Sequence, residues 1–317
     1  MVYEVRPVDA PFEWSVTTPS GTAAEVRAVL DRAEASDGAA ALDEAALLAL
    51  RHRGLAGSTL LVTGEPVAGF AWLREDDLSV VVDPAARAAG RGRALVAAAV
   101  ARGLPDGLTA WSHGNHPAAA ALAREFGFTR VRDLWVMRRS LDDLPPPPEP
   151  GAGGGVVVRP FRPGQDEEAF LAVNAEAFAD HPEQGTMSRA DLEQRMAEPW
   201  FDPAGFFVAE ARPGELPGTT TDPADAPAGL VGFHWTKVHH GERPVGEVYV
   251  VGVSPRAQGG GLGALLTLTG LHHLAGQGLR EVLLYVESDN APAVAVYSRL
   301  GFTHADADTH VQYRFRG

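Results

Sequence analysis

The chain has 317 residues, of which 45% are hydrophobic and 21% are charged, as is typical of a globular protein. Its formal charge of −14 comes from 41 acidic and 27 basic residues, and such a surface repels nucleic acid. Because cysteine is absent, disulfides, thiolate metal sites and cysteine nucleophiles are excluded. A chain of this length is expected to form about two domains.

Neither a membrane nor a secretory context is indicated. No apolar run approaches the roughly 18 residues that a membrane-spanning helix needs. The first residues, Met1 to Arg6, lack the basic start and apolar stretch of a signal peptide. We therefore expect a cytoplasmic protein with no membrane partner.

The first half of the chain has its clearest pattern in the middle. A β-branched strand at Val80–Val82 is followed by a glycine-bearing turn at Arg87–Gly92 and then by an apolar helix. Further on, Asn115–Pro117 and Phe126–Phe128 flank a short helix. The order strand, turn, helix indicates a mixed α and β domain.

Two stretches interrupt the pattern. Prolines at 145–150 and glycines at 151–155 form a stiff and then a flexible piece, which predicts an interdomain linker at 145–155. We therefore expect one domain at 1–144 and another at 156–317. A second Pro- and Gly-rich run, Pro213–Ala228, predicts a surface loop between two strands, Phe206–Ala209 and Leu230–Phe233.

The second half repeats the order of the first. Its predicted elements are a strand at Val248–Val253, a helix at Leu262–Ala275, a strand at Val282–Val286 and a helix at Ala293–Leu300. Asn290 can cap the last helix, Pro292 suits its first turn, and Gly301 suits the position just after its end.

The two halves also match residue by residue. Val80–Pro84 corresponds to Val251–Pro255, and Arg87–Gly92 corresponds with the same spacing to Gln258–Gly263. The later segments Asn115–Pro117 and Phe126–Phe128 correspond to Asn290–Pro292 and Leu300–Phe302, with a slip of one residue between the two segments. The sequence therefore predicts an α+β fold used twice.

The repeated turn points to an anionic ligand. A strand, a glycine-rich turn and a helix start form a concavity of backbone N–H groups, where the helix dipole favours a phosphate. Neither turn has the Lys-Ser/Thr pair of a P-loop or the spacing of a dinucleotide fingerprint. The alternative is that the glycines merely permit a tight turn.

Both turns resemble the pyrophosphate-binding motif of GNAT acetyltransferases, Gln/Arg-x-x-Gly-x-Gly/Ala. The matching positions are Gln258, Gly261 and Gly263, and again Arg87, Gly90 and Gly92. The resemblance implies two tandem GNAT domains, each a mixed central sheet flanked by helices, with one acetyl-CoA in each as cosubstrate. It also implies that the strand before the turn carries a bulge and splays from its neighbour, so that Val251, Gly252 and Val253 present backbone groups to the pantetheine arm and the acetyl carbonyl. The residues that it assigns to acetyl-CoA are Val251, Gly252, Val253, Gln258, Gly259, Gly260, Gly261, Leu262, Gly263, Ala264, Asn290, Ala291, Pro292, Ala293, Val294 and Ala295 in the second domain, and Val80, Val81, Val82, Ala88, Ala89, Gly90, Arg91, Gly92 and Arg93 in the first.

A closer resemblance, over nearly the whole chain, is to the mycothiol synthases, a family of tandem GNAT enzymes. It is carried by the segments His181–Gly185, Pro199–Pro203, Gly232–Lys237, Gly246–Val253 and Leu284–Asn290. It implies transfer of acetyl from acetyl-CoA to the cysteinyl amine of cysteinyl-glucosaminyl-inositol, the last step of mycothiol biosynthesis. One departure is that Gly259 and Gly260 stand where basic side chains are common in this family.

Acetyl transfer to an amine requires a base for the ammonium and an acid for the departing thiolate. Glu247 is the candidate base, since strand alternation predicts that it shares a face with Tyr249, Val251 and Val253. The alternative is a solvated carboxylate at a strand end. Tyr297, on the last predicted helix, is the candidate acid by resemblance, and its alternative is a core aromatic.

The first domain lacks an equivalent acid. The position that matches Tyr297 falls at Leu122 or Ala123, whereas Asp76 aligns with Glu247. We therefore expect this domain to bind acetyl-CoA but to be catalytically degenerate, although an altered activity stays open.

The resemblance also nominates residues for the amine acceptor. These are Glu44 from the first domain and Glu183, Lys237 and Tyr285 from the second, together with Glu247. The histidines lack metal-ligand spacing, so we expect no metal.

Two rival functions remain open. One is a tandem GNAT enzyme that acetylates another amine, such as an aminoglycoside or a protein N-terminus. The other is a non-catalytic acyl-CoA sensor, which the presence of both Glu247 and Tyr297 disfavours. We expect the protein to be a monomer.

Overall fold

The computed structural model describes residues 3–8, 12–14, 20–148, 155–179, 184–211, 229–241 and 243–317. The predicted surface loop Pro213–Ala228 and residues 149–154 of the predicted linker lie outside these ranges. The described chain forms two compact units: residues 1–135 with 305–317, and residues 136–304.

The N-terminal unit opens with an antiparallel sheet of order β1-β2-β3-β4. Buried side chains on α1 and α2 pack on this sheet, among them Val29 and Ala46. The elements in chain order are β1 (Val5–Pro7), α1 (Gly21–Asp37), α2 (Glu44–Arg53), β2 (Thr59–Thr63), β3 (Gly69–Leu73), β4 (Leu78–Val82), η1 (Pro84–Ala86), α3 (Arg91–Val100), β5 (Thr109–Ser112), α4 (Pro117–Glu125) and β6 (Phe128–Ser140).

The C-terminal unit is built on strands in the order β6-β11-β10-β9-β8-β7. The elements that follow β6 in the chain are β7 (Val156–Pro160), α5 (Glu167–Ala177), η2 (Gln184–Thr186), α6 (Arg189–Met196), η3 (Pro203–Gly205), β8 (Phe206–Ala211), β9 (Gly229–His239), β10 (Val245–Val253), η5 (Pro255–Ala257), α7 (Leu262–Gly276), β11 (Glu281–Glu287), α8 (Ala291–Arg299) and β12 (Thr303–Phe315).

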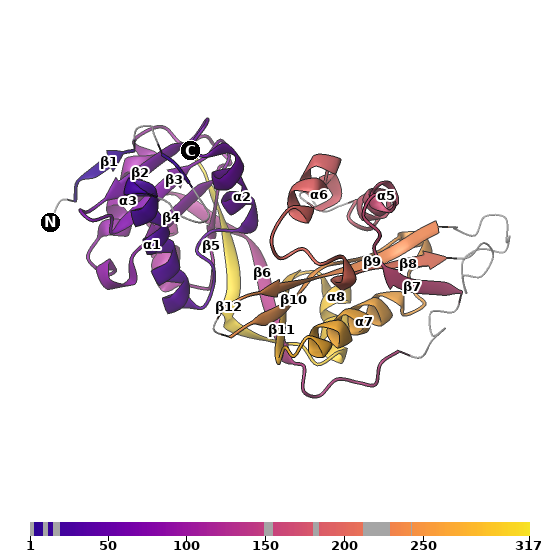
Figure 1. Ribbon diagram of the computed structural model, residues 1–317. Coiled ribbons are helices and arrows are strands. Elements are labelled where there is room, and N and C mark those ends of the chain that lie inside the picture. Colours follow the sequence, from indigo (N-terminus) through magenta and orange to yellow (C-terminus); the bar gives the residue numbers. More distant parts are fainter. Residues whose placement is uncertain are drawn as a thin grey trace. The chain divides into compact units, whose positions relative to one another are not determined.

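Helices cover both faces of this second sheet. Within the C-terminal unit, α5 and α6 lie on one side of strands β7 to β10, and α7 lies on the other (Figure 1). On the α5 side, Phe170 packs with Phe233 and Trp235. On the α7 side, Leu262 and Leu266 pack with Val231. Each side therefore has its own apolar core, as a sheet buried on both faces requires.

The last strands of the two sequence repeats change places. The end of β6, which closes the first repeat, lies beside β11, where Leu141 N donates to Arg280 O at 2.8 Å. The end of β12, which closes the second repeat, pairs antiparallel with β5, with Val311 opposite Ser112. The compact units thus differ from the division predicted at the linker, because residues 136–144 belong to the second unit and 305–317 to the first.

Candidate active site

The glycine-rich turn of the C-terminal unit leads into α7. Gly261 caps that helix with a left-handed φ of 80°, and the first helical hydrogen bond runs from Leu265 N to Gly261 O at 3.0 Å. The N–H groups of the first helical turn therefore have no acceptor within the helix. Gly259 to Gly261 are exposed, so the turn presents donors to solvent as an anion site does.

The N-terminal unit has a turn of the same backbone shape. Gly90 caps α3 with φ 90°, and Ala88 takes a positive φ of 58° where the other turn has Gly259. Arg87 Nε donates to Val82 O at 3.1 Å, as Gln258 Nε2 donates to Val253 O at 3.1 Å. The two turns are therefore structural repeats, not only similar sequences.

Strand β10 carries a bulge beside the site. Its pairing with β9 runs in register up to Val248 opposite Thr236 and resumes with Val250 opposite Trp235, which leaves Tyr249 as the extra residue. Its parallel pairing with β11 spans three described pairs and ends at Val248. Among the described residues the two strands therefore part beyond Val248, where the backbone of Val251–Val253 is left without a partner from β11.

The bulge overturns the prediction that Glu247, Tyr249, Val251 and Val253 share one face. Tyr249 and Val250 both pack against the α5-side core, whereas Val251 and Val253 pack against the α7-side core. Strict alternation fails because one extra residue shifts the side-chain order by one position. Glu247 and Tyr249 do share the α5 side.

Glu247 is a buried carboxylate, with 5% of its surface exposed. The solvated alternative is therefore wrong. Its Oε2 lies 2.6 Å from Nε2 of His239, at the end of β9. Its register partner on β9 is Lys237, so the two side chains leave the same face of the sheet.

The same face carries the predicted acceptor residues of this unit. The Lys237 ammonium lies over the rings of Trp200 and Tyr249, at 4.5 and 5.1 Å from their centroids. Arg195 on α6 donates to the Tyr249 hydroxyl at 2.9 Å. Tyr285 is 43% exposed and lies two residues after Leu283, the register partner of Glu247, so it also faces this side.

Two predicted acceptor residues are not tested by this geometry. Glu44 begins α2 in the N-terminal unit, next to Asp43, whose carboxylate caps the helix by accepting from Ala46 N at 2.7 Å. Glu183 lies outside the described residues. Their contact with an acceptor stays a prediction.

Tyr297 lies on α8, which follows β11 directly. Asn290 caps this helix by accepting from Ala293 N at 3.2 Å, as predicted. The Tyr297 ring makes an edge contact with Phe302, and burial raises the pKa of Tyr297 to about 12. The hydroxyl is therefore protonated at neutral pH. No contact between Tyr297 and Glu247 occurs among the described residues.

The N-terminal unit holds a cavity of about 610 Å³ at its glycine-rich turn. This volume lies within the roughly 300–1,000 Å³ of ordinary small-molecule sites. Every residue that the sequence assigned to acetyl-CoA here lines the cavity except Ala89. Leu122 and Ala123 line it too, so the position that matches Tyr297 carries an apolar side chain in either alignment, and Asp76 is exposed.

Sequence reasoning missed several features of the site. It gave no role to His239 or Arg195, because their contacts join residues distant along the chain. It also missed the pair of Arg87 with Asp37, whose two hydrogen bonds of 2.6 and 2.7 Å hold the pKa of that carboxyl below its usual value. The bulge and the splay of the strand are features that the GNAT resemblance implies, but the sequence did not place the bulge at Tyr249.

Among the described residues, no group of three or more histidine or carboxylate side chains is arranged to hold a metal ion. In the same ranges, no helix has the length and apolar character needed to cross a membrane.

The bulged strand, the splay and the helix-capping glycine turn define an acyl-CoA-binding fold, and comparison with known proteins agrees. The model of the acetyltransferase (GNAT) family matches residues 26–128 and 171–302. A tandem GNAT protein from the clavulanic acid biosynthesis pathway superposes with a TM-score of 0.65 at 19% identity, covering 98% of this chain and 97% of that one. A GCN5-related N-acetyltransferase from Sphaerobacter thermophilus gives 0.63 at 23% identity over 98% and 95%. Both confirm the predicted tandem α+β fold.

The chain therefore belongs to the GNAT family and is an acetyl-CoA-dependent N-acetyltransferase. Within that family it belongs with the mycothiol acetyltransferases. A mycothiol acetyltransferase from Nocardioides sp. is 55% identical over 92% of this chain and 97% of its own length. One from Thermobispora bispora is 49% identical over the same shares.

Proposed function

We propose that the protein transfers the acetyl group of acetyl-CoA to the cysteinyl amine of 1D-myo-inositol 2-(L-cysteinylamino)-2-deoxy-α-D-glucopyranoside, the last step of mycothiol biosynthesis. Support comes from the identity of 55% with a mycothiol acetyltransferase over almost the full length of both chains. The structural observation that carries the proposal is the buried Glu247, which directly precedes Val248, the last residue at which β10 pairs with β11.

The proposed roles follow from what each group can do. Glu247 accepts the proton of the acceptor ammonium, which makes the amine a nucleophile. Backbone N–H groups of Val251–Val253 stabilise the negative charge that develops on the thioester oxygen. Tyr297 gives its proton to the departing thiolate, a role that suits a hydroxyl whose pKa of about 12 keeps it protonated.

Acetyl-CoA itself fits the turn before α7. The unpartnered N–H groups of the first helical turn and the exposed glycines suit a pyrophosphate, which the helix dipole also favours. The remaining predicted contacts, from Asn290 to Ala295, lie on the first turns of α8. In this assignment, acetyl-CoA supplies the activated acetyl group.

The acceptor is proposed to lie on the α5 side of the sheet. Lys237 and Tyr285 offer donors to its hydroxyl groups there, and the acidic Glu183 and Glu44 complete the proposed set. The described geometry supports only Lys237 and Tyr285, which share a face of the sheet with Glu247.

A second acetyl-CoA is proposed for the N-terminal cavity, with a structural role. The lining by the repeated turn supports this, while Leu122 offers no proton to a leaving thiolate. Equilibrium dialysis of acetyl-CoA against the whole protein should give two sites, of which only one empties on addition of acceptor. We also propose a cytoplasmic monomer, which sedimentation and cell fractionation would test.

The experiment that tests the function compares acceptors. Purified protein is given acetyl-CoA and either the cysteinyl-glucosaminyl-inositol, free cysteine, glucosamine or an aminoglycoside, and the acetylated product is quantified. Selective turnover of the first supports the proposal. Faster turnover of another amine would replace the acceptor, and tight acetyl-CoA binding without turnover of any would favour a sensor.

Replacing Glu247 by Gln tests the base. We expect kcat to fall by about 10²–10⁴-fold at neutral pH, and by less at high pH where the free amine forms without help. Acetyl-CoA binding should persist. The matched control is Glu281→Gln, an exposed carboxylate on the neighbouring strand β11, with 49% of its side chain exposed. An unchanged rate in Glu247→Gln would remove this residue as the base.

A further inference from the structure

The buried Glu247 has a direct link to solvent through one side chain. His239 Nε2 lies 2.6 Å from Glu247 Oε2, and the exposed fractions of the two side chains are 44% and 7%. His239 is the last residue of β9, and its register partner is Val245, so the contact with Glu247 runs diagonally between neighbouring strands. The pair therefore reaches from the protein interior to water.

A buried carboxylate that works as a base needs such a route. It must release the accepted proton before the next turnover, and a low-dielectric site without an outlet retards that release. An imidazole is suited to pass protons near neutral pH, because free histidine side chains titrate near pH ~6.5. Its two ring nitrogens allow it to accept a proton on one side and release it on the other.

The face that carries Glu247 also carries two cationic side chains. Lys237, beside Glu247 on β9, already places an ammonium on this face, over Trp200 and Tyr249. Arg195 on α6 adds a guanidinium at the Tyr249 hydroxyl. Just beyond the end of β9, His240 and Arg243 are exposed. The exposed His239 side chain opens onto water at this end of β9.

We propose that His239 relays the proton from Glu247 to solvent, so that the two residues act together in deprotonating the acceptor amine. The proposal rests on the proposed role of Glu247. The ammonium loses its proton to the carboxylate, the carboxylic acid passes it to neutral imidazole, and the imidazolium releases a proton to water or a buffer base. The carboxylate and imidazole are regenerated, and no electrons are exchanged.

A purely positioning role for His239 makes a different prediction. An amide can supply the same hydrogen bond to Glu247, since the N–H of a glutamine side chain can reach the place of Nε2. His239→Gln keeps a donor but cannot relay a proton, whereas His239→Ala removes both. The matched control is His240→Gln, at the adjacent exposed histidine.

The test measures kcat and KM with the acceptor that the protein acetylates fastest, by product formation. A relay predicts that kcat falls about 10–100-fold in both His239 variants, below the 10²–10⁴-fold of a lost direct base, with KM for acetyl-CoA unchanged. Added imidazole should restore His239→Ala in proportion to its free-base concentration. His240→Gln should behave like the unmodified protein.

Two results would overturn the relay. One is near-normal kcat in His239→Gln with a slow His239→Ala, which assigns His239 to positioning only. The other is failure of imidazole to raise the rate of a folded His239→Ala variant. Failure of the proposed role of Glu247 is distinguishable, because it would appear as an unchanged rate in Glu247→Gln, whatever the His239 variants do. Failure of the proposed function would appear in the comparison of acceptors with the unmodified protein.

Discussion

At the scale of single residues, the two proposed proton-transfer groups owe their character to burial. Glu247 is 5% exposed and shares a hydrogen bond with a histidine. Burial disfavours the charged phenolate of Tyr297 and so raises its pKa to about 12. Tyr297 therefore keeps its proton at neutral pH, as the proposed acid must.

Replacing Tyr297 by Phe tests the acid. The variant loses only a hydroxyl, so the ring contact with Phe302 stays and the fold should be intact. We expect kcat to fall about 10²-fold or more while acetyl-CoA binds with near-normal affinity. Steady-state kinetics and isothermal titration measure the two quantities. Full activity would show that another group, or water, protonates the thiolate.

Replacing Gly260 by Arg tests the turn before α7. Gly260 has open space around its Cβ position and no positive φ, so a side chain fits there. An added cation near the pyrophosphate is worth about 1 kcal/mol in water, so KM for acetyl-CoA should fall about fivefold at low salt.

Gly259→Arg is the matched comparison for that variant. It adds the same charge at a φ of 90°, where a side chain strains the backbone. It should gain less affinity and lose stability. Equal affinities at low and high salt in Gly260→Arg would contradict a phosphate at this turn.

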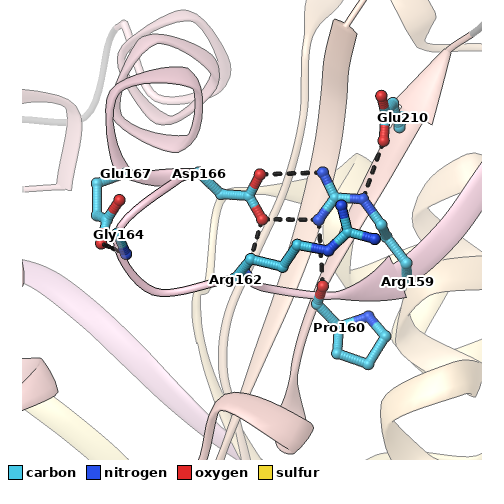
Figure 2. A network of polar contacts seen from close by, with 7 residues as sticks. All are labelled: Arg159, Pro160, Arg162, Gly164, Asp166, Glu167 and Glu210. Atoms are coloured by element: carbon cyan, nitrogen blue, oxygen red, sulfur yellow. Dashed lines mark hydrogen bonds and ion pairs between the residues drawn. The ribbon is translucent and has the colours of Figure 1, made fainter.

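At the scale of elements, the helix that covers the acceptor side of the sheet is held by an ion-pair network. Figure 2 shows Arg159 on β7 between Asp166 and Glu210, with Asp166 at the start of α5. Asp166 receives two hydrogen bonds from the Arg159 guanidinium, at 2.6 and 2.9 Å, and one from Arg162 N at 2.7 Å. Its side chain is 9% exposed, so the network fixes where α5 begins.

We predict that Asp166→Asn lowers the free energy of unfolding of the C-terminal unit by about 2 kcal/mol, as for lost charged hydrogen bonds. The Arg159 guanidinium holds the pKa of Asp166 below its usual value. The contribution is therefore present above the unfolded pKa of about 3.9 and is lost as pH falls through the folded value.

Urea unfolding of both proteins at several pH values checks this prediction. The stability difference should be constant from neutral pH down to about pH 5 and should shrink below about pH 4. Glu210→Gln, which removes the more exposed partner of Arg159, should cost less. A difference that does not depend on pH would mean that the Asp166 charge is not the source.

The bulge in β10 decides which side chains of this strand lie on each side of the sheet. Without it, strand alternation would place Val251 and Val253 on the same face as Glu247 and Tyr249. With it, Val251 and Val253 pack on the α7 side, while Tyr249 stays with Lys237 and Glu247 on the acceptor side. Gly252 is needed close by, because a Cβ there would lie 2.8 Å from the Phe233 ring.

At the scale of the whole molecule, each compact unit needs a strand from the far end of the other sequence repeat. Val311 and Tyr313 of β12 are buried in the core of the N-terminal unit, with Leu61 and Leu95. These side chains come from near the C-terminus, although the rest of that core precedes residue 136. The N-terminal unit is therefore complete only in the full chain.

We predict that Val311→Asp unfolds the N-terminal unit locally, because it buries an unpaired carboxylate where Val311 is 0% exposed. Hydrogen exchange read by mass spectrometry should show lost protection in peptides of α1, β2 and α3. Peptides of α7 and β9 should stay protected. Arg314→Ala, an exposed position on the same strand, is the control. Protection unchanged in all peptides would contradict the dependence on β12.

Much of the architecture followed from local patterns. The α+β class, the repeated glycine turns, the Asn290 cap and the strand and helix positions of the second half were predictable, since they depend on residues near one another in the chain. Glycine at 90 and 261 takes the left-handed conformation that a helix start of this shape requires, so the pattern carries the geometry directly.

The features left to the tertiary structure all depend on contacts between distant residues. The bulge at Tyr249 is a matter of register with β9, the exchange of β6 and β12 depends on strand pairing across the chain, and the link of His239 to Glu247 joins two strands. Periodicity along the sequence contains none of this, because a strand has the same alternation whichever neighbour it pairs with. The sequence by itself thus determined the fold, the family and the chemistry of the turn, while pairing in three dimensions decided which side chains meet at Glu247.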